Sequence, residues 1–433
     1  QQTLHEMDNR GKPTFEAGRD DEGNIVRPPL RIGVASEIQN FSGRVAADLA
    51  LGTAWNLTVG GDVLHTFRDA ERPLRAAPPN REPFIPPFYQ TSDGEILNEA
   101  WPGVTITQGG GFVKASRALG NVLTLTGTTR LDLIQSDANS PTDPFLDNAQ
   151  PGPGRLTEAD LEQDDVTISG AFTASLSLTE RWTLSLGGGS VARAPTALER
   201  YSDRFPATKM QTSAEFQGTP SLDPERSTQG DLWIEGRGRN WSVSASGFVR
   251  HLEDYITLAP ASDIAPILPL SPETVFRYTN GEANFFGSEV SAAVSPIRPL
   301  TVRVSGSWLW GNDTALDEPA FGVSPPSANV GLRWTPSILR VRWASDLYLD
   351  GTVNLVAEQD RVARSRNETP TDGYTTVDLQ VGVQFMRQLA LKIGVENLTD
   401  ATYTNHLNAK NPFMGVRIAE PGRMFTTNLT VRF

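Results

Sequence analysis

The sequence predicts an all-β fold, a transmembrane antiparallel β-barrel, and three observations support this prediction. Helical periodicity is almost absent, whereas apolar and polar residues alternate with period two in many segments. These segments run for about ten residues or more, against about five or six in an ordinary strand. Short connections alternate with long polar loops along the chain. Together these features favour lipid, rather than a second sheet, on the apolar face of each strand.

The segment 376–385 shows the alternation most clearly. Its apolar residues fall on one face: Val377, Leu379, Val381, Val383 and Phe385. The segments 123–133, 166–178, 341–350 and 424–433 repeat the pattern. A strand tilted by about 45° needs about 9–11 residues to cross the hydrocarbon of a bilayer, with a polar lumen on its other face. Closure into a barrel also pairs every backbone amide, which hydrocarbon demands.

The connections between these strands fall into two alternating classes. Short turns are expected near 52–56, 119–121, 179–181, 238–240, 295–300, 336–338 and 386–388. Long loops rich in Pro and Gly are expected at 70–100, 137–164, 192–225, 259–273, 311–323, 357–373 and 397–422. Outer-membrane barrels have short turns on one side and long loops on the other. The pattern gives about sixteen strands and sends the last one toward the short-turn, periplasmic side.

Tryptophan supports the same architecture. The residues concerned, mostly near expected strand ends, are Trp55, Trp182, Trp241, Trp308, Trp310, Trp334 and Trp343. An aromatic girdle at the membrane interface would use them in these places. The alternative is ordinary core tryptophan.

Composition excludes several other classes of protein. The 433 residues contain no cysteine, so disulfide frameworks and thiolate metal sites are ruled out. No stretch approaches the roughly 18 consecutive apolar residues of a membrane helix. The net charge of −13 argues against a nucleic-acid partner. The sequence also lacks a recognisable catalytic constellation in its required context, so an enzyme is not expected.

Several short motifs are spread over most of the chain. They are Val191-Ala-Arg-Ala-Pro195 followed by Glu199-Arg-Tyr201, Leu222-Asp-Pro-Glu-Arg-Ser-Thr228, Tyr278-Thr-Asn280 before Gly287-Ser-Glu289, Gly394-Val-Glu-Asn-Leu-Thr-Asp400 before Tyr403, and the terminal Phe433. In this order they resemble the motifs of TonB-dependent outer-membrane receptors. The resemblance implies a barrel of about 22 strands with an N-terminal plug inside it. It also implies energy coupling through the TonB complex of the inner membrane.

The sequence departs from that family pattern at its beginning. The plug and its TonB box, the segment that contacts TonB, are missing, and the strand count falls about six short of 22. We therefore expect residues 1–433 to be the C-terminal part of a receptor barrel that starts within a strand. Alone, such a chain should be unable to gate or couple.

The segment Leu4-His5-Glu6-Met7-Asp8-Asn9 is the most informative about the ligand. On a strand, His5 and Met7 share one face, and imidazole with thioether is a soft pair suited to Cu(I). The segment resembles the His-x-Met-Asp-Asn motif of TonB-dependent copper receptors, and the resemblance implies that the plug supplies the remaining ligands. The alternative is that both residues are lumen or girdle residues without a ligand.

The last long loop offers a second candidate for metal binding. His406 and Met414 lie in it and could form an outer capture point, although ordinary loop residues are the alternative. The stretches 406–412 and 417–423 resemble the copper branch of the family. With only His5, His65, His251 and His406 in the chain, a multi-histidine zinc site is hard to build.

The function expected from these observations is import of a metal, most of all copper, by a TonB-dependent receptor of the bacterial outer membrane. Copper is then a transported ligand, and no cofactor is expected. An iron-siderophore or zinc receptor is the alternative within the class, and a passive porin or structural barrel is the alternative outside it. The expected partners are the TonB complex, outer-membrane lipid and lipopolysaccharide, and the metal or its chelate.

Overall fold

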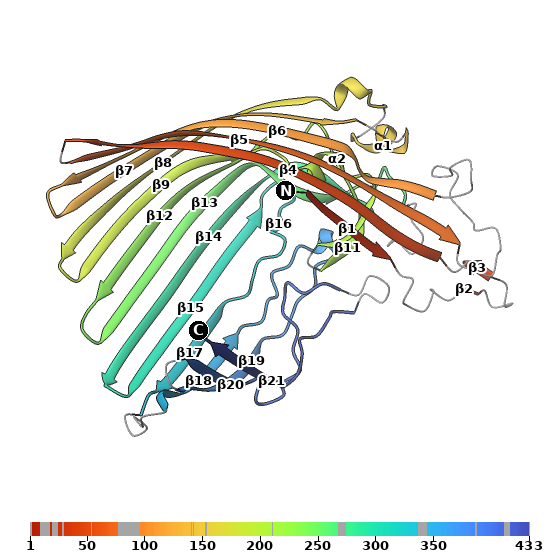
Figure 1. Ribbon diagram of the computed structural model, residues 1–433. Coiled ribbons are helices and arrows are strands. Elements are labelled where there is room, and N and C mark those ends of the chain that lie inside the picture. The colour runs from red at the N-terminus through yellow and green to blue at the C-terminus, as the bar shows by residue number, and fades with distance from the viewer. Residues whose placement is uncertain are drawn as a thin grey trace.

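The computed structural model describes residues 2–8, 18–19, 25–27, 30–52, 54–76, 96–139, 141, 143–151, 154–209, 211–266, 274–336, 344–385, 388–410 and 416–432. In this part of the chain the principal sheet has 19 strands. Three of them belong to the long connections, and the other sixteen follow one another as an antiparallel meander (Figure 1). Among the helices of the described residues, none is long and apolar enough to span a membrane.

The strands of the meander are mostly long. The first eight are β1 (Gln2–Asp8), β4 (Leu30–Leu51), β5 (Trp55–Ala76), β6 (Ile96–Leu119), β7 (Leu123–Ala138), β8 (Gln163–Thr179), β9 (Trp182–Arg193) and β12 (Glu225–Arg237). The second eight are β13 (Trp241–Pro260), β14 (Phe276–Ile297), β15 (Leu300–Asp313), β17 (Ser327–Trp334), β18 (Ala344–Val356), β19 (Tyr374–Phe385), β20 (Leu389–Glu396) and β21 (Met424–Val431). β5 and β6 have 22 and 24 residues and extend into the segment 70–100, which the sequence predicted as loop.

The connections contain the remaining, shorter elements. These are β2 (Gly18–Arg19), β3 (Ile25–Arg27), α1 (Asp143–Asn148), η2 (Glu158–Asp160), α2 (Ala197–Tyr201), β10 (Phe205–Lys209), β11 (Thr212–Gln217), β16 (Glu318–Pro319) and η4 (Arg364–Arg366). Short turns join β4 to β5, β6 to β7 and β8 to β9, and this alternation of short and long connections continues to β21. The predicted two-sided pattern is therefore confirmed.

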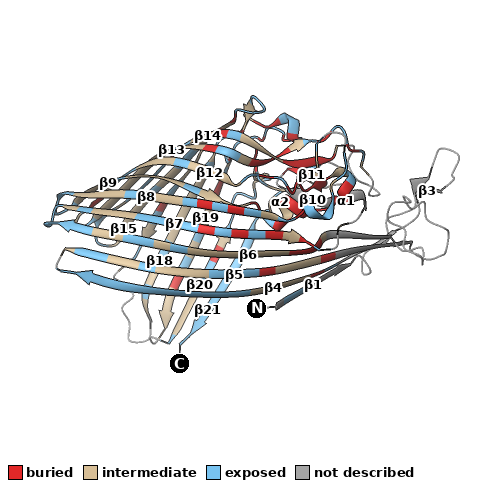
Figure 2. Cartoon of the chain, turned by 90° about the horizontal axis from the view of Figure 1, so that it is seen from above, coloured by how far each residue is buried: buried red, intermediate tan, exposed pale blue. Residues whose placement is uncertain are grey.

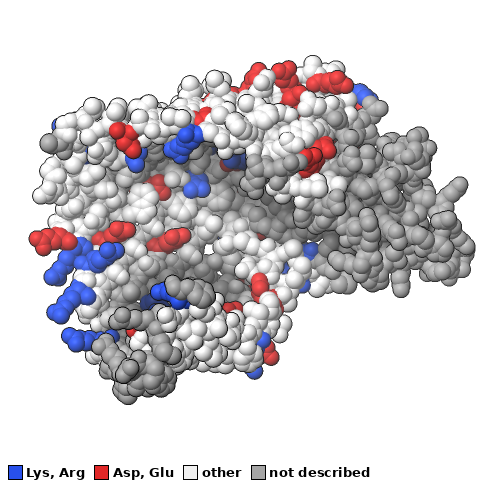
Figure 3. Space-filling view, viewed as in Figure 1, with Lys and Arg blue, Asp and Glu red and all other residues white. Residues whose placement is uncertain are grey.

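The sheet bends into a curved wall. Each strand of the meander pairs with the next, from β1 with β4 to β20 with β21. Among the described strands, no register joins β21 to β1, and the wall is open between them in Figure 1. The wall is therefore a barrel segment, and it is hollowed on its lumen side (Figure 3).

The two faces of the strands differ as the alternation predicts. On β8, Val166 and Ile168 leave 65% and 59% of their surface exposed, whereas Thr167 between them leaves 3%. On β7, Leu133 is 58% exposed beside Asp132 at 6%. Apolar side chains thus point outward and polar ones point inward, which is the reverse of a soluble protein and typical of a barrel wall in lipid.

Tryptophans mark the short-turn end of the wall. Trp55, Trp182 and Trp241 each begin a strand. Trp334 ends one, and the rings of Trp182 and Trp241 lie 5.5 Å apart. This placement agrees with an interface girdle. Trp343 lies outside the described residues.

The long connections fold together over the other end of the wall, and we call this layer the cap. It comprises the described parts of 139–162, 194–224, 261–275, 314–326, 357–373 and 397–423. Buried residues gather in and beside the cap, around α1, α2, β10 and β11 (Figure 2). In one apolar cluster Phe145, Leu161 and Tyr201 pack together. In a second, Phe216 of β11 packs on Phe276 of β14, and these two strands pair in parallel.

Candidate functional site

The backbone of His5 and Met7 lies on β1, although their side chains are outside the described part of the structure. His5 is opposite Ser36 on β4, and Met7 is opposite Val34. Ser36 is only 7% exposed and faces the lumen, in the same row as the buried Ala70 of β5. Residues directly opposite one another in an antiparallel pair share one face. Positions 5 and 7 therefore both fall on the lumen face, toward the cap.

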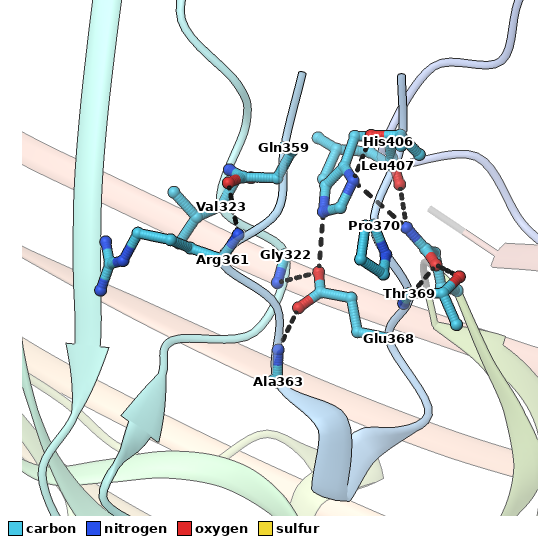
Figure 4. Close-up of polar contacts among 12 residues, drawn as sticks. Gly322, Val323, Gln359, Arg361, Ala363, Glu368, Thr369, Pro370, His406 and Leu407 are labelled. Atoms are coloured by element: carbon cyan, nitrogen blue, oxygen red, sulfur yellow. Dashed lines mark hydrogen bonds and ion pairs between the residues drawn. The ribbon is translucent and has the colours of Figure 1, made fainter. Parts of the chain in front are cut away.

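His406 lies inside the cap and is 2% exposed. Its Nδ1 is 2.8 Å from the Thr371 hydroxyl, and its Nε2 is 3.0 Å from the Glu368 carboxylate (Figure 4). An ionised carboxylate only accepts hydrogen bonds, so in this contact the Nε2 of His406 is the donor. A metal at His406 would have to displace one of these partners. Met414, the expected second ligand there, lies outside the described residues.

The Glu368 carboxylate holds three of the long connections together. The residue is 3% exposed, and besides His406 it accepts hydrogen bonds from the backbone amides of Gly322, at 3.0 Å, and Ala363, at 2.6 Å. A buried carboxylate needs such donors, because burial removes its water. Glu368 thereby ties 314–326 to its own connection.

Gln211 brings a further connection to the same place. Its Nε2 donates to the carbonyl oxygen of His406 at 2.8 Å, and its Oε1 accepts from the backbone amide and hydroxyl of Thr369, each at 3.0 Å. We call His406, Glu368, Thr371 and Gln211 the histidine hub. The hub joins four of the long connections of the cap.

Arg366 forms a second, equally buried centre, which we call the arginine hub. Its guanidinium lies 2.6 Å from Asp313 at the end of β15 and 2.8 Å from Glu318 of β16. It also donates to the Leu258 carbonyl at 2.6 Å and to the Thr257 hydroxyl at 3.0 Å. Because Arg366 is 0% exposed, these partners replace its hydration completely. The hub fastens η4 to β13, β15 and β16.

The Glu199-Arg-Tyr201 motif has a similar structural role. Arg200 donates to both carboxylate oxygens of Asp165 on β8, at 2.8 and 3.0 Å, and to the Leu222 carbonyl at 2.7 Å. Tyr201 donates its hydroxyl to the Leu161 carbonyl at 2.7 Å. Burial raises the pKa of Tyr201 to about 12. The motif thus anchors α2 to the rim of the wall.

Charged side chains of the lumen wall are paired below the cap. Arg130 of β7 lies 2.7 Å from Asp62 of β5 and also contacts Asp132 on its own strand at 2.5 Å. Gln108 donates to Asp132 at 3.0 Å. A side chain at Gly110 would collide with Arg130 and Asp132, so glycine leaves the space that this cluster fills.

The remaining histidines lie apart from these centres. The Nδ1 of His65 is 2.9 Å from the Thr107 hydroxyl, and that of His251 is 2.9 Å from the Asn284 amide oxygen. By strand alternation, both histidines belong to the outer face of the wall. Among the described residues, no group of three or more His, Cys, Asp or Glu side chains could hold a metal ion. The roles of His5 and Met7 therefore stay predictions.

The two hubs were missed by the sequence interpretation. Gln211 and His406 are 195 residues apart, and Arg366 and Asp313 are 53 apart. Residues so far apart in the sequence have no local spacing pattern from which their contact could be predicted. The loop 357–373 contains six other charged residues, so nothing in the sequence distinguished Arg366 from them.

Comparisons with known proteins agree on the architecture. The family described as "TonB dependent receptor-like, beta-barrel" matches residues 8–398. The vitamin B12 transporter BtuB of Photobacterium profundum is 24% identical over 232 residues, which are 54% of this chain and 34% of that protein. The chain thus spans about a third of this curated relative.

Solved structures share the fold. The copper transporter OprC superposes with a TM-score of 0.75 at 20% identity, over 100% of this chain and 61% of that one. The FrpB iron transporter from Neisseria meningitidis gives 0.61 at 15%, over 94% and 56%. The ferric yersiniabactin uptake receptor FyuA from Yersinia pestis gives 0.64 at 14%, over 93% and 55%.

Proposed function

Because the chain belongs to the TonB-dependent receptor β-barrel family, we propose that residues 1–433 are the barrel part of an outer-membrane receptor that imports copper. The outward apolar face and the tryptophan girdle support a place in the lipid of a bacterial outer membrane. The proposed partners are a plug domain, the TonB complex that acts through it, and the surrounding lipid and lipopolysaccharide.

The register of β1 is the observation that most favours copper as the ligand. It puts positions 5 and 7 on the lumen face, two residues apart, at the level where a ligand would arrive from the cap. Imidazole and thioether groups together select a soft ion such as Cu(I) over oxygen-seeking cations. The fold likeness to a copper transporter supports the same choice. Two ligands make only half of a site, so the plug would supply the others.

An iron-chelate receptor is the second candidate, because iron transporters share this fold. It would hold its ligand through the cap rather than through His5 and Met7. A zinc receptor would need more imidazole groups than the lumen face offers. The cap argues against a passive porin, because the two hubs connect the long loops with one another across one end of the wall.

Metal titration of the full-length receptor, purified from outer membranes, tests the proposal. We expect saturable copper binding that weakens at least tenfold in His5→Ala and in Met7→Ala. His251→Ala is the matched control, because it removes an imidazole from the outer face. Copper binding that is the same in all four proteins, or binding of a ferric chelate with no copper binding, would reject the copper assignment.

A further inference from the structure

The short-turn end of the wall carries a row of arginines. Arg181, Arg239 and Arg298 lie in three successive short turns, between β8 and β9, β12 and β13, and β14 and β15. All three are exposed, and the described part of the chain offers no ion-pair partner to their guanidinium groups. Basic side chains are visible along this edge of the molecule in Figure 3. Because Glu180 is the one carboxylate of these turns, their net charge is positive.

Backbone hydrogen bonds hold the three turns side by side. The amide of Arg237, at the end of β12, donates to the carbonyl oxygen of Arg181 at 2.9 Å. The amide of Ser295 on β14 donates to the carbonyl oxygen of Asn240 at 2.7 Å. Neighbouring hairpins of a sheet are two strands, or about 10 Å, apart. The flexible side chains of two adjacent arginines can therefore converge on one group between them.

A pair of tryptophans lies beside these arginines on the outer face. Trp182 follows Arg181 directly and is opposite Gly236 of β12, whereas Trp241 begins β13 beside Gly238. A side chain at either glycine would collide with a tryptophan ring, so glycine leaves the space that the rings fill. The ring centroids are 5.5 Å apart. The two rings thus form one aromatic surface at the ends of β9, β12 and β13.

The outer face of β13 shows where this surface lies in a bilayer. Its outward residues after Trp241 are Val243, Ala245, Gly247 and Val249, and His251 follows Trp241 by ten residues. A tilted strand crosses the hydrocarbon in about 9–11 residues. The tryptophan pair therefore lies at one boundary of the hydrocarbon, where indole rings are favoured. The arginines of the turns lie just beyond this boundary, at the level of the lipid headgroups.

The same combination of residues occurs elsewhere along this end of the wall. Arg117 of β6 is opposite Trp55 of β5, and its guanidinium carbon lies 5.0 Å from the centre of the Trp55 ring. A guanidinium group over an indole face is held there by a cation–π interaction. Arginine and tryptophan thus lie together at several places around the short-turn end, which favours a lipid with a negative headgroup over one without.

We propose that this part of the outer face binds an anionic phospholipid of the periplasmic leaflet, with its phosphate on Arg181 and Arg239 and its upper acyl chains on Trp182 and Trp241. A guanidinium group binds phosphate oxygens through two parallel hydrogen bonds. The positive net charge of the turns favours a net negative headgroup over a zwitterionic one. The site goes beyond the proposed import of copper and rests only on the proposed place of the wall in the outer membrane.

Native mass spectrometry of the full-length receptor in detergent micelles tests this site, with phosphatidylglycerol and phosphatidylcholine as the probes. We expect the first phosphatidylglycerol to bind at least tenfold more tightly than phosphatidylcholine. Arg239→Gln should weaken phosphatidylglycerol binding roughly fivefold, and Arg181→Gln in addition should bring the loss to at least tenfold. Arg364→Gln is the matched control, because it removes an exposed arginine from the cap, at the other end of the wall.

Glycerol phosphate, which has the headgroup phosphate but no acyl chains, distinguishes a lipid site from a site for any small anion. It should not displace phosphatidylglycerol at equal concentration, since it makes no contact with the tryptophan rings. Equal affinities for the two lipids, an equal loss in Arg364→Gln and in the double variant, or displacement by glycerol phosphate overturns the proposal. Because these measurements contain no metal, their result is independent of the copper titration.

Discussion

Replacing Arg366 by methionine measures how strongly the arginine hub holds the cap. The change removes a guanidinium group that makes ion pairs to Asp313 at 2.6 Å and Glu318 at 2.8 Å. Asp313 is 0% exposed, and within the described part of the chain its carboxylate would keep only the backbone amide of Leu316, at 3.0 Å. Removing one partner of a buried ion pair lowers the free energy of unfolding by about 3–5 kcal/mol. At about 1.4 kcal/mol for each tenfold change, local opening of the cap should become roughly a hundred- to several-thousand-fold more frequent.

Hydrogen exchange followed by mass spectrometry on the full-length receptor gives this opening equilibrium directly. We expect faster exchange in 357–373 and around β16, and unchanged exchange in β8. Arg364→Met is the matched control, because Arg364 belongs to the same short helix and is exposed. Equal protection of 357–373 in Arg366→Met and the native receptor would refute the idea that this hub holds the cap. Adding Asp313→Leu should restore part of the protection, since the buried unpaired carboxylate is then gone.

Two further predictions concern the wall and the rim. Val45→Arg, on the outer face, should lower the free energy of unfolding of the barrel by roughly 2–4 kcal/mol, measured by guanidinium unfolding from lipid vesicles. Ser42→Arg, on the lumen face, should leave this free energy unchanged. Equal effects of the two variants would contradict the assignment of inner and outer faces. Above pH 10 the cap should lose about 1.4 kcal/mol of stability per pH unit up to about pH 12, because the unfolded chain releases the Tyr201 proton first. Absorbance titration of tyrosinate should show a late step that Tyr201→Phe removes, and a native titration curve identical to that of the variant would exclude a raised pKa.

The wall of the fold was predictable because its signal is local. Val377, Leu379 and Val381 alternate with polar residues, and a strand must put such a series on one face. The length of each series then indicates the environment, since a soluble sheet has no need of such long alternation. Strand ends were less predictable: β5 continues through the stretch 68–75, in which five of the eight residues are charged, because pairing with β4 and β6 persists beyond the apolar part.

The site was predictable only where residues are neighbours in the sequence. His5 and Met7 could be placed on one face of a strand from their spacing alone. The sequence interpretation put His406 in the last loop, but its partners Glu368 and Gln211 come from other loops and depend on how the connections fold together.

The cross-connections of the cap determine how the open end of the wall can change shape. Gln211 follows β10, whereas His406 precedes β21, so the bond between them braces parts of the wall that are many strands apart. A loop held by several such braces does not swing away independently of the others. Opening of the cap therefore requires a concerted release of these braces, and loosening of one brace lowers the free-energy cost of loosening the next.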